Sequence, residues 1–481
     1  MKQDIIKMSV KTLSRCLETK ELSALEAADA YLEQIEKKEA EIGAFLTITK
    51  EAAWETAKQV DAKRMKNEPL PPLAGIPAGI KDNICTKGIP TTCASRMLEH
   101  FIPPYDAAVM EQMKASGVVM LGKLNMDEFA MGSTTEHSYF KETHNPRDLS
   151  RVPGGSSGGA AAAVAAYEAA FSLGSDTGGS IRQPAAFCGV VGMKPTYGTV
   201  SRYGLVAFAS SLDQIGPLTR TVEDNALILQ SIISQDQRDT TSLAHPNPDF
   251  LAGLEKGVQG LRIALPKEYF APGIDPEIRQ AVKKAAASFE KMGAKVGEAS
   301  LPTLEYALPA YYVISSAEAS SNLSRFDGVR YGYRSENAPS LEELYKNTRS
   351  EGFGEEVKRR ILLGTFVLSA GYYDAYYKKA QQVRSLVCRD FEQVFSQWDL
   401  ILSPVAPTTA YRLGEKRENP LEMYQGDLCT VPVNIAGLPA LSMPCGFDRE
   451  GLPIGMQIIG KHFREDLIYQ AAQAFEKEAA I

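Results

Sequence analysis

Residues 151–195 read RVPGGSSGGAAAAVAAYEAAFSLGSDTGGSIRQPAAFCGVVGMKP, with a serine in each of two glycine-rich turns. Glycines flank Ser156 on both sides and precede Ser180. Glycine permits positive φ and lets the backbone approach a ligand closely, which a purely structural segment seldom needs twice in succession. Two hydroxyls on such tight turns therefore suggest nucleophilic chemistry.

The base that activates such a serine is usually a histidine. The chain has five histidines, and none lies in either turn: His100, His137, His144, His245 and His462. A neutral lysine can replace histidine in this role. Lys81 ends an apolar run within residues 72–90, PLAGIPAGIKDNICTKGIP, and is the candidate base.

Lys81 must lose its proton to act as a base. Starting from an ordinary pKa of about 10.4, neutrality at pH 7 costs about 4.6 kcal/mol. Burial lowers a lysine pKa by about 3 to 5 units, so this cost is attainable. The neighbours Ile76, Ile80 and Ile84 fit a desolvated site. On a strand, Asp82 would point to the opposite face.

Ser180 is followed by Ile-Arg, which predicts a turn that leads into a helix. The backbone N–H groups of this turn would converge as an oxyanion hole, made by Thr177, Gly178, Gly179 and Ser180. A helix N-cap serine is the structural alternative. Arg182 and Asp213 would either support this turn or form a structural ion pair.

Ser156 also fits a different hydrolase pattern. Residues 154–158, GGSSG, match the G-x-S-x-G nucleophile elbow of α/β-hydrolases. That alternative requires an acid and then a histidine downstream, for which only His245 and His462 are available. A phosphate-binding loop fits less well, because GGSSGG lacks the G-K-[ST] ending.

Length and charge limit the kinds of partner. The chain has 481 residues, a net charge of −7 and a pI near 5.6, so we expect no global attraction to nucleic acid or anionic lipid. Its seven cysteines lack C-x-x-C spacing and nearby histidines, which indicates reduced thiols and no metal site. Without a run of 18 apolar residues or an apolar leader, the protein is expected to be cytoplasmic.

The chain divides into a helical start and a long α/β region. Residues 1–70 are rich in Ala, Glu, Lys and Leu with helical spacing, and Ser23 to Glu26 has the form of a capping box. From residue 71 to 481, short apolar runs alternate with amphipathic stretches. This pattern predicts an α/β fold with a largely buried sheet. A mostly helical layer is expected at about 304–397, and a β-hairpin at 441–460.

Three segments together are similar to the amidase signature family. They are the G-I-P-x-x-x-K-D run that contains Lys81, the GGSSGG turn, and GSDTGGSIR, where Ser175 replaces the family's usual threonine. The resemblance implies that residues 71–481 form an amidase-signature catalytic domain, with a large mixed twisted β-sheet covered by helices on both faces. It also implies a Ser-Ser-Lys triad. In that triad Ser180 is the nucleophile, Ser156 is the bridge and Lys81 is the base. It also implies a cis peptide bond before Ser156.

The family includes fatty-acid amidases, nitrile-pathway amidases and the glutaminase subunits of tRNA-dependent amidotransferases. Residues 311–334, 349–366, 371–381 and 423–446 resemble the glutaminase branch. A glutamine pocket needs a cation for the α-carboxylate and an anion for the α-ammonium. The resemblance assigns these roles to Arg360 and Asp427, with Tyr311 as a third contact. The adjacent Arg359 and Tyr312 leave an uncertainty of one residue.

The same resemblance implies partner proteins. Ammonia from glutamine would travel to a B subunit that uses ATP and Mg²⁺ to activate Glu-tRNA(Gln), while a small C subunit would bind this chain in a heterotrimer. Contact with tRNA would be mainly through the B subunit. No cofactor is implied in this chain, and no membrane contact. The alternatives are a stand-alone amidase that acts on another small carboxamide, and a scaffold for the assembly.

Overall fold

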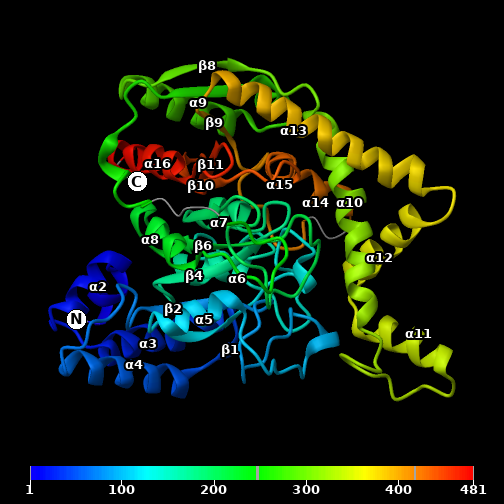
Figure 1. Ribbon diagram of the computed structural model, residues 1–481, viewed down its shortest axis with the longest axis horizontal. Helices are drawn as coiled ribbons and strands as arrows, with labels where there is room; N and C mark the ends of the chain where they lie inside the picture. Colours follow the sequence, from blue (N-terminus) through cyan, green and yellow to red (C-terminus); the bar gives the residue numbers. More distant parts are fainter. Residues whose placement is uncertain (1, 245–248, 416–418, 480–481) are drawn as a thin grey trace.

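The computed structural model describes residues 2–244, 249–415 and 419–479. Within these ranges eleven strands form one sheet in the order β1-β3-β2-β4-β6-β5-β10-β11-β9-β7-β8 (Figure 1). The strands are β1 (Phe45–Ile48), β2 (Pro77–Lys81), β3 (Val119–Leu124), β4 (Phe171–Asp176), β5 (Val191–Lys194), β6 (Gln214–Thr219), β7 (Arg262–Pro266), β8 (Lys295–Ala299), β9 (Leu400–Pro404), β10 (Ala440–Phe447) and β11 (Pro453–Gly460). β2 pairs in parallel with β3 and β4, whereas β4 pairs antiparallel with β6. This mixed sheet confirms the predicted fold class.

Sixteen α-helices surround the sheet in the described part of the chain. They are α1 (Lys2–Lys7), α2 (Val10–Glu18), α3 (Ala24–Ile42), α4 (Lys50–Met65), α5 (Ala108–Ala115), α6 (Gly158–Ala165), α7 (Arg182–Cys188), α8 (Val222–Ile232), α9 (Pro276–Lys291), α10 (Ala307–Asn322), α11 (Leu341–Gly352), α12 (Glu355–Leu368), α13 (Lys379–Gln397), α14 (Pro420–Gln425), α15 (Val431–Ile435) and α16 (Glu465–Ala479). A π-helix, η7 (Tyr373–Lys378), leads into α13.

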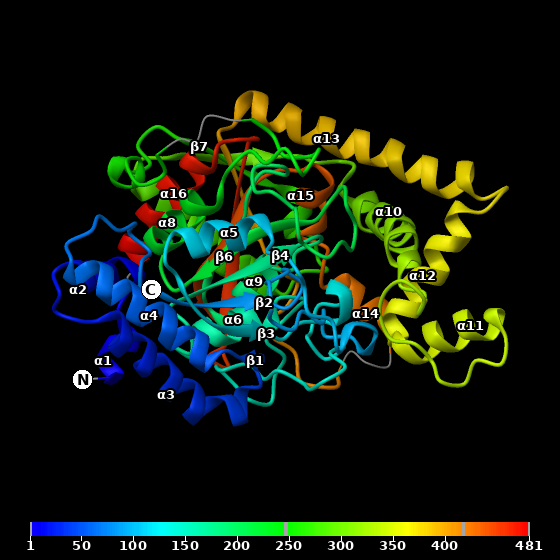
Figure 2. The same cartoon turned by 60° about the horizontal axis from the view of Figure 1, so that its bottom comes forward.

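Helices cover both faces of the sheet. On β11, Gly455 and Gly460 are an odd number of residues apart and therefore point to opposite faces. A Cβ at Gly455 would meet Ala186 of α7, whereas a Cβ at Gly460 would meet Ile468 of α16. α7 and α16 thus pack on opposite faces. At one end of the sheet, α3 and α4 lie against β3 (Figure 2).

A helical layer stands beside the sheet. In Figure 1, α10, α12 and α11 form a column along one side of the molecule, and α13 crosses at its top. α10 packs against α12, α13 and α15. These helices fill most of residues 304–397, where the sequence predicts a helical layer. The division of the chain into segments 1–70 and 71–481 stays a prediction.

Local sequence signals correspond to observed elements. Ser23 and Glu26 form the predicted capping box at the start of α3. The predicted hairpin is the antiparallel pair β10–β11. The helical prediction for residues 1–70 missed β1, whose four residues pair antiparallel with β3 at the edge of the sheet. A strand this short, lying between two helices, gives little periodic signal.

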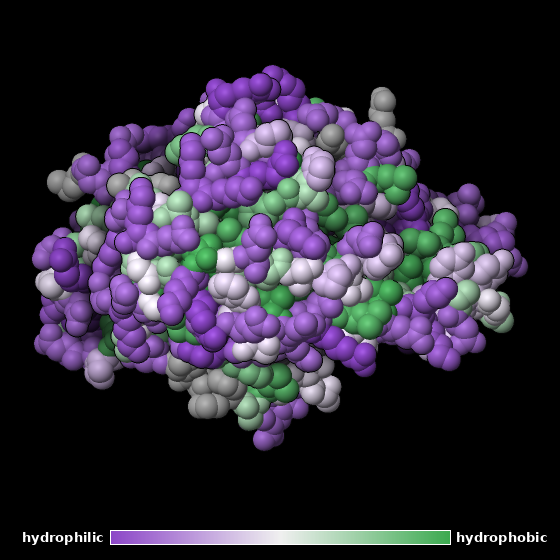
Figure 3. Space-filling view, turned by 90° about the horizontal axis from the view of Figure 1, so that it is seen from above, coloured by the Kyte–Doolittle hydropathy of each residue, from purple (hydrophilic) through white to green (hydrophobic). Residues whose placement is uncertain are grey.

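The surface is mostly hydrophilic on the face shown in Figure 3, where apolar residues form separate patches. Exposed apolar side chains include Leu362 and Phe366 of α12. Across the described residues, none of the helices combines the length and the hydropathy needed to cross a lipid bilayer.

Candidate active site

Parallel strand pairing brings the predicted reactive segments together. β2 and β4 run side by side with Ile80 opposite Leu173, so their carboxyl ends meet at the same edge of the sheet. β2 ends at Lys81 and β4 ends at Asp176, just before the second serine turn. The first serine turn leads into α6, which packs on β2 and β4. The base and both turns therefore converge at one place.

Lys81 lies in a buried network of hydroxyl groups. Its Nζ lies 2.7 Å from Ser156 Oγ, 2.8 Å from Ser157 Oγ and 2.9 Å from Ser175 Oγ. The carbonyl oxygen of Ser175 is a fourth neighbour at 3.3 Å. An ammonium group has three N–H donors, whereas a neutral amine has two and a lone pair that accepts a hydroxyl proton. The arrangement suits a lysine that takes the proton of Ser156.

The pKa of Lys81 fits this role. Burial lowers it to about 7, although Asp127, Asp176 and Asp213 act in the opposite direction. Asp82, next in the chain, is no partner of Lys81: its carboxylate accepts the Thr92 N–H at 2.8 Å and lies 3.5 Å from Lys123 Nζ. Because adjacent residues on a strand face different environments, Asp82 does not hold Lys81 in its charged form.

The two predicted serines differ in exposure. Ser156 is fully buried beside Lys81, whereas Ser180 keeps 7% of its surface exposed. The Gly155–Ser156 peptide bond is cis, as the resemblance implied. The carbonyl of Ser180 accepts the Ser157 N–H at 3.1 Å and joins the two turns. A fully buried serine on the lysine and a second serine that keeps a small exposed surface suit a bridge and a nucleophile.

Asp176 organises the turn that carries Ser180. Its Oδ1 accepts the Gly179 N–H at 2.9 Å, and its Oδ2 accepts Arg182 Nε at 3.0 Å. Burial alone would raise the pKa of Asp176, but Arg182 holds it at about 2. The Gly179 N–H is thus bonded to Asp176 in this structure. The oxyanion-hole role of Thr177, Gly178, Gly179 and Ser180 stays a prediction.

Asp213 supports the same turn from the other side. Its Oδ1 accepts the hydroxyl of Thr177 at 2.7 Å, and its Oδ2 accepts the Phe208 N–H at 2.9 Å. Burial raises the pKa of Asp213 to about 6. Arg182 pairs with Asp176, so the alternative of an ion pair between Arg182 and Asp213 is not what the structure has.

A charged cluster of five side chains lies on α10, α12 and the α14–α15 segment. Its members are Tyr312, Glu356, Arg360, Tyr424 and Asp427. Arg360 Nε donates to Glu356 Oε1 at 2.6 Å, and its guanidinium carbon lies 4.5 Å from the Tyr312 ring centroid and 4.8 Å from that of Tyr424. Tyr312 donates its hydroxyl to Asp427 Oδ2 at 2.7 Å. Arg360 and Asp427 therefore both contact Tyr312.

In this cluster Arg360 stays charged, whereas the carboxyl of Asp427 can gain or lose a proton near neutral pH. Burial works against the charge of Arg360, but the Glu356 carboxylate holds the pKa of the guanidinium above its ordinary value. Burial raises the pKa of Asp427 to about 7, even though Tyr312 and Arg360 favour the carboxylate form. Arg360 uses Nε for Glu356, so its terminal fork has the geometry to bind a ligand carboxylate.

The structure separates the neighbouring residues that sequence left as alternatives. The Arg359 side chain is 44% exposed, whereas that of Arg360 is 4% exposed and faces the cluster. Both tyrosines are buried. A Cβ at Gly178 would lie 2.5 Å from the Tyr311 hydroxyl, so Tyr311 packs on the predicted oxyanion turn while Tyr312 contacts Asp427.

Tyr311 and Thr430 connect the charged cluster to the serine turns. The Tyr311 and Tyr312 rings meet edge to face, 5.1 Å apart. The Thr430 hydroxyl donates to the Gly178 carbonyl at 2.6 Å. The Thr430 N–H donates to the Asp427 carbonyl at 3.1 Å. The cluster and the Ser180 turn thus form one continuous site.

Sequence reasoning missed several members of this site. They are Asn83, Ser157, Glu356, Tyr424 and Thr430, which hold Ser175, Lys81, Arg360 and Gly178 in place. Ser157 was visible as the second serine of GGSSGG, and Glu356 as an acid one helical turn before Arg360. The remaining contacts join segments far apart in the chain and leave no local signal.

The α/β-hydrolase alternative gains no support at its histidines. The Nε2 of His462 lies 3.0 Å from the Ala436 carbonyl oxygen, with which it forms a hydrogen bond. His245 lies outside the described residues. The group next to Ser156 Oγ is the amine of Lys81.

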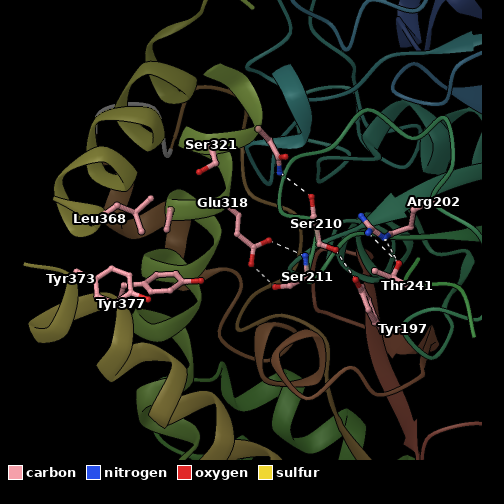
Figure 4. Close-up of a pocket in the computed structure, with 12 residues that line it drawn as sticks. Tyr197, Arg202, Ser210, Ser211, Thr241, Glu318, Ser321, Leu368, Tyr373 and Tyr377 are labelled. Carbon is pink, nitrogen blue, oxygen red and sulfur yellow. Dashed lines mark hydrogen bonds between the residues drawn. The ribbon is translucent and has the colours of Figure 1, made fainter. Parts of the chain in front are cut away.

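A separate cavity of about 560 Å³ lies on α10 (Figure 4). Glu318 points across it and accepts the N–H of Ser211 at 2.8 Å and its hydroxyl at 2.6 Å. Leu368, Tyr373 and Tyr377 form the opposite wall. The described residues that line it include no member of the predicted triad or of the charged cluster, so it is distinct from the site.

Comparisons with known proteins agree with these features. The model of a family described as Amidase matches residues 26–469. The chain is 60% identical over 469 residues to the A subunit of glutamyl-tRNA(Gln) amidotransferase from Geobacillus kaustophilus, covering 98% of this chain and 96% of that one. It is 59% identical over 470 residues to the protein of that name from Moorella thermoacetica, covering 98% and 96%. The crystal structure of the protein of that name from Thermotoga maritima superposes with a TM-score of 0.82 at 44% identity, covering 98% of this chain and 95% of that one.

Proposed function

The chain belongs to the amidase family, and from this premise we propose that it hydrolyses glutamine with Lys81, Ser156 and Ser180. It is the amidohydrolase component of a glutamyl-tRNA(Gln) amidotransferase, the enzyme named in relatives that match nearly the whole chain. The observation that carries the mechanism is the 2.7 Å contact between Lys81 Nζ and Ser156 Oγ, made by a lysine whose pKa burial lowers to about 7.

The proposed reaction is an acyl transfer in two halves. Lys81 takes a proton from Ser156, Ser156 takes the proton of Ser180, and the freed Ser180 oxygen bonds to the amide carbon. The N–H groups of residues 177–180 stabilise the oxyanion. The carbon–nitrogen bond then breaks, and the same relay returns the proton to the departing ammonia. Water next cleaves the acyl-Ser180 ester, which releases glutamate.

The charged cluster accounts for the choice of glutamine. Its amide must reach Ser180 while its α-carboxylate and α-ammonium each meet an opposite charge. Arg360 binds the carboxylate through its fork and Asp427 binds the ammonium. Tyr311, packed between Gly178 and Tyr312, positions the chain of the substrate between the two ends.

The released ammonia requires a partner that uses it. The relatives are named as subunits of an amidotransferase, which supports an assembly with further subunits. We propose that these are a B subunit, which binds ATP, Mg²⁺ and most of Glu-tRNA(Gln), and a small C subunit. This chain itself needs no cofactor for amide hydrolysis. Its location is the cytoplasm, where aminoacyl-tRNA is used.

A substrate comparison on the full chain, co-expressed with its partner subunits, tests this function. Glutamine should release ammonia and, with Glu-tRNA(Gln) and ATP present, should yield Gln-tRNA(Gln). A protein that hydrolyses simple carboxamides but not glutamine would instead be a stand-alone amidase. The contrary result is a wild-type complex that uses free ammonia but never glutamine, with Ser180→Ala leaving its use of ammonia unchanged. That result would leave the chain with only a scaffold role.

A further inference from the structure

A short segment, residues 127–130, links the serine turns to α12, the helix that carries Arg360. At its start, the Asp127 N–H donates to the Ser156 carbonyl at 3.3 Å. A Cβ at Gly155 would lie against the Asp127 carboxylate, so this residue packs directly on the first serine turn. The next residue, Glu128, turns the other way and reaches the start of α12.

Glu128 caps the first turn of α12. Its Oε2 accepts the N–H of Gly354 at 2.8 Å, and its Oε1 accepts the hydroxyl of Ser95. Gly354 is the residue before the first turn of α12. An added Cβ there would collide with the Glu128 carboxylate, so glycine allows the close approach. Glu128 is buried, and a carboxylate that accepts donors at a helix N-terminus is favourably placed.

Packing and backbone strain fix the segment in place. Phe129 and Ala130 have φ of 48° and 63°, a left-handed conformation that costs such residues about 1 kcal/mol or more each. The Phe129 ring packs on Phe326 at 5.1 Å and on Phe353 at 5.7 Å. Phe353 directly precedes Gly354, so hydrogen bonds and aromatic contacts hold the same point of α12. Strain of this kind persists where the surroundings over-determine the conformation.

Arg360 lies less than two helical turns after Gly354. A shift at the start of α12 is therefore carried to the guanidinium, and small displacements of positioning groups strongly affect binding and rate. We infer that Glu128 is a positioning residue, which sets α12 against the serine turns so that Arg360 meets the α-carboxylate of glutamine while the amide lies at Ser180. This role rests on the proposed glutaminase function.

The test uses glutamine and two analogues with the full chain in its assembly. Glutaramate keeps the carboxylate but lacks the ammonium, and 4-aminobutanamide keeps the ammonium but lacks the carboxylate. Glu128→Ala should raise KM about 10-fold for glutamine and glutaramate. It should leave KM for 4-aminobutanamide and all three kcat values within about twofold. Glu128→Gln should restore near-normal KM, because its amide oxygen still accepts the Gly354 N–H.

Two further variants keep the test decisive. Glu476→Ala is the matched control, since Glu476 accepts the Val222 N–H at 2.9 Å at the start of α8, away from the site, and its KM values should not change. Ser95→Ala removes the other hydrogen bond to Glu128, so it should give the same substrate pattern at about threefold. If Glu128→Ala does not fold, Ser95→Ala alone tests the positioning role.

The outcomes separate this role from the glutaminase function itself. Equal KM increases for all three substrates overturn the positioning role. The absence of any KM increase in folded Glu128 and Ser95 variants overturns it as well. A wild-type assembly that does not hydrolyse glutamine overturns the proposed function instead.

Discussion

The serine turns and the charged cluster treat a buried cation in opposite ways within one site. Around Lys81 the partners are hydroxyls and a carbonyl, and burial leaves the lysine ready to lose its charge. Around Arg360 the partners are a carboxylate and two aromatic rings, which keep the charge in place. Neutral groups thus carry the chemistry and charged groups carry the recognition. Changes in the first region should affect every amide, whereas changes in the second should affect only charged substrates.

Removing the nucleophile gives the largest expected effect. Ser180→Ala should lower kcat by about 10⁴-fold or more for glutamine, glutaramate and 4-aminobutanamide alike. Ammonia release measures the loss, and thermal unfolding checks that the fold is kept. Ser442→Ala is the control, because its buried hydroxyl has no hydrogen-bond partner among the described residues. Ammonia release at the normal rate by folded Ser180→Ala would falsify the assignment of the nucleophile.

Replacing the base should have the next largest effect. Lys81→Arg keeps a charge but removes the neutral amine, because guanidinium does not deprotonate in proteins, so kcat should fall by about 10²-fold or more. In the wild type, the lowered pKa of about 7 means that Lys81 is protonated and inactive at lower pH. With butanamide, which carries no α-charge, kcat/KM should fall about tenfold per pH unit below 7 and level off above it.

A flat pH profile for butanamide between pH 5 and 8 would show that the base lies elsewhere. Near-normal turnover by Lys81→Arg would lead to the same conclusion. Either result would also remove the contrast between a neutral reactive region and a charged recognition region.

The anion of the cluster should act on binding alone. Asp427→Asn removes the charge that meets the α-ammonium, a contact worth about 1.5 to 3 kcal/mol, so KM should rise about 10- to 150-fold for glutamine and 4-aminobutanamide. Glutaramate, which lacks the ammonium, should be hydrolysed with nearly unchanged KM. Equal losses on all three substrates would instead mean that Asp427 supports the site as a whole.

The smallest effect is expected at the arginine next to Arg360. The Arg359 side chain is 44% exposed and pairs with the buried Glu356 carboxylate, which keeps its contact with Arg360 when Arg359 is removed. Arg359→Ala should change KM and kcat by less than about twofold. Arg360→Ala should raise KM for glutamine and glutaramate but not for 4-aminobutanamide. If Arg359→Ala behaved like Arg360→Ala, the choice between the two arginines would be wrong.

The serine turns were predictable because residues next to one another in the sequence mark them. Glycines on either side of Ser156 and before Ser180 mark turns, and the apolar run up to Lys81 marks a buried strand. The structure confirms that Lys81 and Ser156 are in contact. The fate of the Gly179 N–H was not predictable, because the competing acceptor is the side chain of Asp176 and depends on its rotamer.

The charged cluster was only partly predictable. Resemblance pointed to Arg360 and Asp427, but the sequence gives no reason for Tyr424 to stack on Tyr312 at 4.1 Å. Such contacts arise where α10, α12 and the α14–α15 segment meet, and these elements are separated in the sequence. Secondary-structure periodicity identifies each helix but does not specify which neighbour it faces.

Asp427 adds a linkage between substrate and solvent protons. With a pKa of about 7, roughly half of the empty sites carry a proton on this carboxyl at neutral pH. An arriving ammonium favours the ionised form, so binding expels that fraction of a proton into the buffer. Affinity for glutamine therefore increases as pH rises through 7. The heat measured by calorimetry at pH 7 depends on the ionisation enthalpy of the buffer chosen.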